Sequence, residues 1–248
     1  CRNAYFFVLL HAKLKVMNDF FARSEALLGA KAMEALRTRR VIIFGVGGVG
    51  SYAAEALVRT GLTHLTIVDD DLVHPSNINR QIPATSLTIG SPKVEALRER
   101  LLSIHPEAEI TARCERVNGE WLKTNGLEGY DYLIDAIDSV ADKTDLILYA
   151  SRVRGLKTFS SMGAALRFDP TQVTTGELMT IKGDALAKAV RARMKRIDAK
   201  PSKKIRCVYS TEQAQACETR GSLMQVTAVF GCSLASLVIN DICKHSNQ

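Results

Sequence analysis

The sequence lacks the cysteine pairs and the targeting signal that mark several common protein classes. None of its six cysteines forms a C-x-x-C pair, which excludes a zinc ribbon and a thioredoxin-type redox motif. The apolar run at residues 5–10 is too short for a secretory signal and has no small-residue cleavage site. Scattered thiols without such a signal indicate a reducing, cytoplasmic setting.

A membrane-spanning segment is also not expected. The most apolar stretch, residues 223–239, contains Gln225 and several hydroxyl groups, so it predicts a buried helix and no stable membrane insertion. The chain has 248 residues, 46% of them apolar and 24% charged, which is typical of a globular protein whose core needs no disulfides. Residues 1–16 are expected to be a leader or N-terminal extension, and residues 17–248 a single domain.

The order of the apolar runs predicts the fold class. Short β-branched runs alternate with amphipathic helical patterns through residue 163, beginning with a helix expected over residues 18–37. This alternation predicts a doubly wound, Rossmann-like α/β fold with a mainly parallel sheet. The pattern then changes, and runs at 164–168 and 172–175 predict antiparallel strands that extend the sheet. We therefore expect a nucleotide-binding half, residues 17–163, and a substrate-binding half, residues 164–248.

A glycine-rich loop follows the first predicted strand. Gly45, Gly47 and Gly50 form G-x-G-x-x-G between that strand and a helix, which is the context a phosphate-binding loop requires. Phosphate oxygens can approach the bare backbone amides there, and the helix N-terminus adds partial positive charge. Asp69, at the end of the second strand, is placed to accept a ribose hydroxyl. The loop predicts a bound nucleotide without deciding which one.

Three charged residues further along favour phosphoryl or nucleotidyl transfer over hydride transfer. Arg80 follows the acidic strand end, Lys93 opens the next helix, and Asp138 follows the fourth strand, where ligands of open α/β sheets gather. A nicotinamide pocket needs no such group of charges. Transfer at phosphorus requires cations against the developing charge and a carboxylate that holds Mg²⁺. Each residue taken alone could be an ordinary surface charge.

The positive charge of the chain is concentrated in one segment. Residues 182–206 contain ten basic and two acidic residues, a surplus of +8 against a net +7 for the whole chain. Such a surplus favours a polyanion partner, most simply a nucleic acid backbone, although a solvated helix face remains the alternative. The predicted contacts are Arg191, Arg193, Lys195, Arg196, Lys203 and Lys204.

Five ordered motifs together resemble one enzyme family. G-V-G-G-V-G-S, I-V-D-D-D, S-N-I-N-R-Q, S-P-K-V-E and D-A-I-D-S, within residues 20–241, resemble the ubiquitin-activating-type adenylating enzymes. The resemblance implies that ATP is bound, with Arg80 and Lys93 acting on the transferring phosphate and Asp138 holding Mg²⁺. It also implies a homodimer in which Arg23 reaches the partner's active site. The nucleotide-binding residues it implies are Gly45, Gly47, Gly48, Gly50, Asp69, Asn77, Arg80, Lys93, Asp138 and Ser139.

Within that family the sequence resembles the tRNA-modifying dehydratase branch. The implied reaction is ATP-dependent dehydration and cyclisation of N6-threonylcarbamoyladenosine in tRNA through an acyl adenylate, with release of AMP and pyrophosphate. The basic segment and the missing cysteine pairs favour this branch over the adenylyltransferases that activate the C-terminus of a sulfur carrier protein. A dehydrogenase and a non-catalytic nucleotide sensor are weaker alternatives. A sulfur-transfer partner, either a cysteine desulfurase or a sulfur acceptor, and a role for Cys207 or Cys217, stay open.

Overall fold

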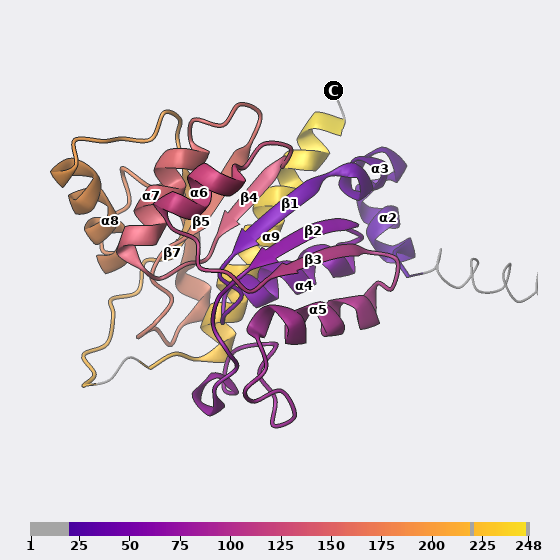
Figure 1. Cartoon of the computed structure of the whole chain (residues 1–248), viewed down its shortest axis with the longest axis horizontal. Coiled ribbons are helices and arrows are strands. Elements are labelled where there is room, and N and C mark those ends of the chain that lie inside the picture. The colour runs from indigo at the N-terminus through magenta and orange to yellow at the C-terminus, as the bar shows by residue number, and fades with distance from the viewer. Residues whose placement is uncertain (1–19, 219–220, 247–248) are drawn as a thin grey trace, which may run out of the picture.

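The computed structural model describes residues 20–218 and 221–246, so the predicted leader at residues 1–16 lies outside the described residues. Within them one seven-stranded sheet forms the centre of the molecule, in the order β3-β2-β1-β4-β5-β7-β6 (Figure 1). The strands are β1 (Arg40–Phe44), β2 (His64–Val68), β3 (Glu109–Arg113), β4 (Tyr132–Asp135), β5 (Lys157–Ser161), β6 (Val173–Glu177) and β7 (Arg206–Ser210).

The sheet is mainly parallel, as the sequence predicts. Every neighbouring pair from β3 to β7 runs parallel, and β6 alone is antiparallel to its neighbour β7. This confirms the Rossmann-like fold with an antiparallel pair in the C-terminal half. The strand expected at residues 164–168 is wrong, because that segment is an irregular connection in which Leu166 has a φ of 62°. The pairing partner of β6 comes instead from β7.

Helices cover both faces of the sheet. Helices α4, α5 and α9 lie on one face with α3 at its end, and α6, α7 and α8 lie on the other (Figure 1). Successive strand residues point to opposite faces, so Val41 and Ile43 pack in the first layer while Ile42 and Phe44 pack in the second. The helices are α2 (Ala22–Leu28), α3 (Ala30–Thr38), α4 (Gly50–Thr60), α5 (Lys93–Ile104), α6 (Gly119–Asn125), α7 (Val140–Ala150), α8 (Ala185–Arg196) and α9 (Met224–Ser246).

The helix expected over residues 18–37 is two helices where the structure describes it. Gly29 separates α2 from α3 with a φ of 80°, a left-handed value that glycine adopts without steric cost. Met33 and Leu36 of α3 are buried, whereas α2 buries none of its own residues. The spacing of apolar residues is therefore the same on both sides of Gly29, so it does not show that the chain bends there.

Helix α9 is the buried helix that the sequence predicts. By length and composition it could cross a membrane, but it packs along α4 in the core, with Phe230 and Leu234 fully buried. The two helices approach closely at Gly231, where a Cβ atom would overlap Val49 and Tyr52 of the facing segment. One side of α9 therefore belongs to the core, with 44% of its most apolar stretch buried inside the fold.

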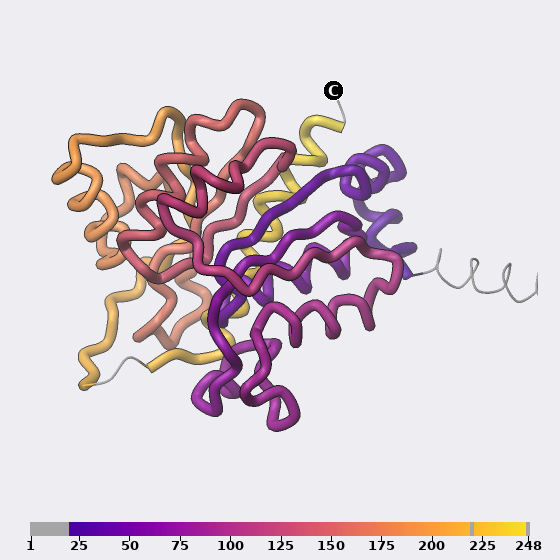
Figure 2. The backbone as a smooth tube through the Cα atoms, in the orientation of Figure 1, coloured from indigo at the N-terminus to yellow at the C-terminus, as the bar shows by residue number. Residues whose placement is uncertain are grey.

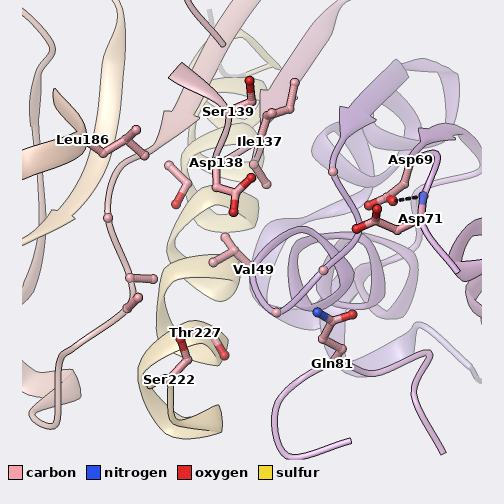
Figure 3. Close-up of a pocket in the computed structure, with 18 of the residues that line it drawn as sticks. Val49, Asp69, Asp71, Gln81, Ile137, Asp138, Ser139, Leu186, Ser222 and Thr227 are labelled. Carbon is pink, nitrogen blue, oxygen red and sulfur yellow. Dashed lines mark hydrogen bonds between the residues drawn. The ribbon is translucent and has the colours of Figure 1, made fainter. Parts of the chain in front are cut away.

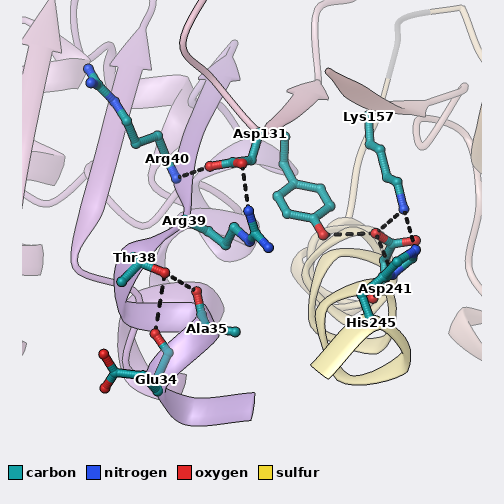
Figure 4. A network of polar contacts seen from close by, with 10 residues as sticks. Glu34, Ala35, Thr38, Arg39, Arg40, Asp131, Lys157, Asp241 and His245 are labelled. Carbon is teal, nitrogen blue, oxygen red and sulfur yellow. Dashed lines mark hydrogen bonds and ion pairs between the residues drawn. The ribbon is translucent and has the colours of Figure 1, made fainter. Parts of the chain in front are cut away.

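A polar network ties α9 to the amino-terminal ends of the strands (Figure 4). Asp241 accepts hydrogen bonds from Lys157 Nζ at 2.6 Å and from the Tyr132 hydroxyl at 2.8 Å. Beside it, Asp131 accepts from Arg39 Nη1 at 2.9 Å and from the backbone N–H of Arg40 at 2.8 Å. These charges are paired with one another at the end of the sheet where the strands begin.

Candidate active site

One cavity opens at the carboxyl-terminal edge of the parallel strands (Figure 3). It has a volume of about 600 Å³ and is lined by residues from both halves of the chain. One wall consists of the glycine loop, the segments after β2, β3 and β4, and the start of α9, which lies against Gly48. The other wall consists of residues 161–167 and the start of α8. The predicted site residues that line it are Gly45, Gly47, Gly48, Asp69, Asn77, Arg80, Lys93, Asp138 and Ser139.

The glycine loop turns tightly from β1 into α4. Gly45 has a φ of 82°, and a Cβ atom there would lie 2.8 Å from the carbonyl oxygen of Ala136. A Cβ atom on Gly50 would overlap the carbonyl oxygen of Gly45, so Gly50 closes the turn although it does not line the cavity. The turn brings the N-terminus of α4 to the cavity, as a phosphate-binding loop requires.

Asp69 binds two backbone amides in the wall that carries the glycine loop. Its carboxylate accepts hydrogen bonds from the backbone N–H of Val46 at 2.7 Å and of Asp71 at 2.9 Å, the second of which is drawn in Figure 3. Burial raises the pKa of this carboxyl, against the opposing effects of the Lys93 ammonium and the two amides. Asp69 thus fixes the glycine loop against the end of β2 and keeps an acceptor at the cavity.

The segment between β2 and α5 folds back on itself beside the cavity, projecting from the sheet edge in Figure 2. Leu72 and Pro92 form an isolated bridge that closes this segment at its base. Lys93 follows the bridge as the first residue of α5; its side chain is 6% exposed and donates to Asp71 Oδ2 at 2.6 Å. The bridge therefore fixes a buried cation at the cavity wall.

Arg80 is the second cation of this wall. Its Nη1 donates to the backbone carbonyl of Ser76 at 2.9 Å and to Asn79 Oδ1 at 2.8 Å, and no carboxylate of the described residues pairs with it. Its Cγ lies 3.3 Å from the point where a Cβ of Gly48 would stand, so Arg80 lies against the glycine loop. The positive charge of Arg80 is therefore available to an anion held by that loop.

Two further residues of this segment line the cavity. Asn77 is buried and its Oδ1 accepts from the backbone N–H of His74 at 3.0 Å, which holds the turn carrying Arg80. Gln81 is buried as well, and its Oε1 has no hydrogen-bond partner among the described residues. Sequence reasoning quoted Gln81 within the motif but gave it no role; its position next to Arg80 was the available signal.

Asp138 faces the cavity from the loop after β4 (Figure 3). It is exposed and makes no hydrogen bond or ion pair within the part of the chain that the structure describes. The neighbouring Ser139 caps α7, accepting from the backbone N–H of Asp142 at 3.4 Å. An unpaired carboxylate beside two cations and a phosphate loop fits the oxygen ligands that Mg²⁺ prefers.

A buried ion pair beneath this loop was missed by sequence reasoning. Lys143 Nζ lies 2.7 Å from Asp135 Oδ2, and both side chains are fully buried. The Ser160 hydroxyl donates to the same carboxylate at 2.6 Å, and the backbone N–H of Ile137 donates to Asp135 Oδ1 at 3.1 Å. Asp135 thus holds the start of the loop that presents Asp138. Its signal, a lysine in the first turn of the following helix, is visible only once the helix is placed.

Arg23 lies far from the cavity of its own chain. It is exposed on α2 and does not line the cavity. Phe21, just before that helix, packs with its ring centroid 4.7 Å from that of His105, at the end of the sheet where the strands begin. Arg23 could therefore serve an active site only in another copy of the chain.

The predicted polyanion contacts divide into two groups. Lys195, Arg196 and Lys204 are exposed and make no hydrogen bond or ion pair with residues that the structure describes. The other three have partners. Arg191 donates to the Leu178 carbonyl at 2.8 Å, and Arg193 Nη2 lies 3.2 Å from Asp145 Oδ1. Lys203 donates to the Val153 and Leu156 carbonyls. Of the six, Arg193 alone is paired with a carboxylate of the described residues, while the carbonyl contacts orient Arg191 and Lys203 without cancelling their charge.

The cysteines show no reactive arrangement among the described residues. Cys207 is fully buried in β7, and burial raises its pKa, which keeps the thiol protonated and unreactive at neutral pH. Cys217 is exposed in the segment before α9 and lies outside the cavity lining. Neither thiol is needed by the chemistry that the cavity can perform.

Comparison with known proteins agrees with this geometry. A "tRNA threonylcarbamoyladenosine dehydratase" of Bacillus subtilis is 36% identical over 192 residues, which cover 77% of this chain and 74% of the relative. Crystal structures of the Escherichia coli tRNA N6-threonylcarbamoyladenosine dehydratase with AMP and with ATP superpose with TM-scores of 0.88 and 0.86 at 35% and 34% identity, each covering 93% of this chain and 96% of the other.

Similarity to carrier-activating enzymes is more restricted. A molybdopterin-synthase adenylyltransferase of Salmonella typhimurium is 34% identical over 116 residues, which cover 47% of this chain and 46% of the relative. The ThiF family model, by contrast, matches residues 21–248. The resemblance drawn from the five motifs is thereby confirmed, and the chain belongs to the ThiF family.

Proposed function

We propose that this chain is an ATP-dependent enzyme that dehydrates and cyclises N6-threonylcarbamoyladenosine in tRNA. The observation that carries the proposal is a cavity in which a phosphate loop and two cations share the lining with residues from the other half of the chain. A nucleotide and an acyl substrate can therefore meet in one site. The named relatives from Bacillus subtilis and Escherichia coli support the same reaction.

In the first step the threonyl carboxylate of the modified adenosine attacks the α-phosphorus of ATP. A bond forms between a carboxylate oxygen and phosphorus, and the bond from the α-phosphorus to the bridging oxygen of pyrophosphate breaks. Arg80 and Lys93 offset the charge that grows on the phosphate oxygens, because both cations lie on the wall that carries the glycine loop. The product is an acyl adenylate.

The carboxylate of Asp138 is the residue that would hold Mg²⁺. Bound Mg²⁺ would neutralise charge on the polyphosphate. The chain's own contribution is to leave this carboxylate unpaired and to fix its loop through the buried Asp135.

In the second step a ureido oxygen or nitrogen of the same modification attacks the activated carbonyl. The bond between that carbonyl and the AMP oxygen breaks, the attacking group loses a proton, and a five-membered ring closes. The oxygen lost from the substrate leaves in AMP, so the substrate loses one water in total. No covalent enzyme intermediate forms, which agrees with the buried position of Cys207.

The tRNA backbone is proposed to contact Lys195, Arg196 and Lys204, the three predicted contacts that are exposed and make no hydrogen bond or ion pair with described residues. Replacing all three by Gln is expected to weaken tRNA binding and to make the log–log salt dependence of the binding constant shallower by about 2–3 units. ATP affinity should stay unchanged, because these residues lie away from the cavity lining. Filter binding over a salt series measures both effects.

A matched control removes the same charge elsewhere. Lys31, Lys123 and Lys244 are exposed on α3, α6 and α9, and their replacement by Gln should leave the salt slope near that of the unmodified protein. Equal slopes in the two triple variants would show that the basic segment is a solvated surface.

The remaining predictions extend the same proposal. A homodimer would let Arg23 act in the partner's cavity, since it cannot reach its own, and scattering in solution would measure the assembly.

A cytoplasmic location follows from the tRNA substrate and is checked by cell fractionation. A sulfur-transfer partner, either a cysteine desulfurase or a sulfur acceptor, stays a prediction, tested by co-purification.

The function itself is tested by nucleoside mass analysis of threonylcarbamoylated tRNA incubated with the protein, ATP and Mg²⁺. Loss of one water from the modified adenosine, with AMP and pyrophosphate formed in equal amounts, is the expected result, and omission of Mg²⁺ should abolish it. Unchanged tRNA, with adenylation only when a Gly-Gly-ended carrier protein is supplied, would assign the chain to the carrier-activating branch instead.

A further inference from the structure

The second wall of the cavity contains a buried arginine that the proposed reaction has not used. Arg167 lines the cavity in the connection between β5 and β6, and its side chain is 3% exposed. The residue before it, Leu166, has a φ of 62°, donates its N–H to the Gly221 carbonyl at 2.9 Å and accepts from the Gln215 N–H at 2.9 Å. The backbone that presents Arg167 is therefore held in place from both sides.

The guanidinium of Arg167 is largely without partners. Its Nη2 lies 4.0 Å from Asp184 Oδ2, which is beyond hydrogen-bond distance, and its Nε and Nη1 make no hydrogen bond within the described residues. Asp184 is already engaged, because its carboxylate accepts from the N–H of Ala187 at 2.8 Å and of Gly163 at 3.1 Å. A buried cation with unmet donors is costly unless a ligand supplies acceptors.

The position of this cation points to the class of ligand. Arg80 and Lys93 lie on the wall that carries the phosphate loop, whereas Arg167 lies on the opposite wall, where Ala185 and Leu186 also bring the N-terminus of α8 to the cavity. A planar guanidinium presents paired donors that match a carboxylate. The second wall is thus suited to the carboxylate that is adenylated.

We propose that Arg167 binds and orients the substrate carboxylate, or the acyl group that it becomes, opposite the phosphate loop. This rests on the proposed adenylation, and it makes Arg167 the residue that selects a carboxylate-bearing substrate. Arg167 acts on the acyl substrate and not on ATP, which separates its role from those of Arg80 and Lys93.

The test compares Arg167→Met with the unmodified protein in the tRNA dehydration assay. We expect kcat/KM for the modified tRNA to fall about 10- to 100-fold while ATP affinity, measured without tRNA, changes less than about twofold. Arg167→Lys, which keeps the charge but loses the planar fork, should recover only part of the loss. Added guanidinium at millimolar concentration should partly restore Arg167→Ala, an effect that a purely structural arginine would not show.

The matched control is Arg39→Met. Arg39 also has a buried, unpartnered Nε and an ion pair, but it lies at the opposite edge of the sheet, so its loss should leave kcat/KM unchanged. An unchanged kcat/KM in Arg167→Met, or an equal fall in ATP affinity, would overturn the proposal. If the unmodified protein adenylates only a carrier protein, the proposed function fails while the Arg167 variants still test carboxylate recognition with that substrate.

Discussion

Replacement of Lys93 by Met should reduce AMP release by a factor of about 10²–10³ while the protein stays folded. The substitution keeps the length of a side chain that is only 6% exposed and removes the positive charge from the wall that carries the phosphate loop. Folding should survive because the partner carboxylate of Asp71 is 67% exposed and can be hydrated by water when the ammonium is gone. Turnover, measured as AMP formed with modified tRNA, and circular dichroism together test the prediction.

Lys157→Met provides the matched comparison. Lys157 makes an equally short ion pair, 2.6 Å to Asp241, but at the edge of the sheet where the strands begin (Figure 4). The same loss of charge there should leave turnover within about threefold. Turnover in Lys93→Met that matches this control would remove Lys93 from the reaction.

The Lys93 variant also tests whether Arg23 acts across a dimer. Arg23→Ala and Lys93→Met should each be inactive alone, whereas an equilibrated mixture should regain part of the activity. In a mixed dimer one cavity would combine the intact Lys93 of one chain with the intact Arg23 of the other. No recovery, despite subunit exchange, would place Arg23 outside the active site.

Removal of the buried cation in Lys143→Met is expected to lower the free energy of unfolding by about 3–5 kcal/mol. The carboxylate of Asp135 would stay fully buried with only the Ser160 hydroxyl and the Ile137 amide as donors. Urea unfolding followed by fluorescence measures the change, and a single transition would also support one domain over residues 17–248.

A double variant distinguishes the cost of leaving a buried charge unpaired from the cost of altering the packing of the core. Asp135→Asn with Lys143→Met removes both charges, so it should recover a large part of the stability lost in Lys143→Met. A loss below about 1 kcal/mol in the single variant would show that water or a rearranged side chain reaches Asp135.

The parts of the site written as contiguous motifs could be predicted from the sequence. The glycine loop, Asp69, Arg80 and Lys93 each follow a strand end or open a helix, and parallel strands bring those ends to one edge. Asp138 is found by the same rule. The sheet order follows less directly, since the strand expected at residues 164–168 is an irregular connection in the structure.

Features set by tertiary packing could not be predicted in this way. Whether a basic helix residue faces solvent depends on what packs beside it, so the charge count could not separate Lys195 from Arg193, which lies against Asp145. Arg167 stands in the sequence within Arg167-Phe168-Asp169-Pro170, a segment that resembles the tRNA-modifying branch but does not indicate a buried side chain. Its burial in the second wall depends on the left-handed turn at Leu166 and on contacts with residues 215 and 221.

Helix α9 contributes Thr227 to the cavity beside Gly48, so an element far along the chain completes the wall begun by the glycine loop. On the ribosome, α9 emerges after the glycine loop by an interval on the order of ten to thirty seconds. During that time the nascent sheet exposes the apolar face that α9 later covers, and the wall that carries the glycine loop is incomplete. The complete cavity can therefore form only after α9 has packed against α4, late in synthesis.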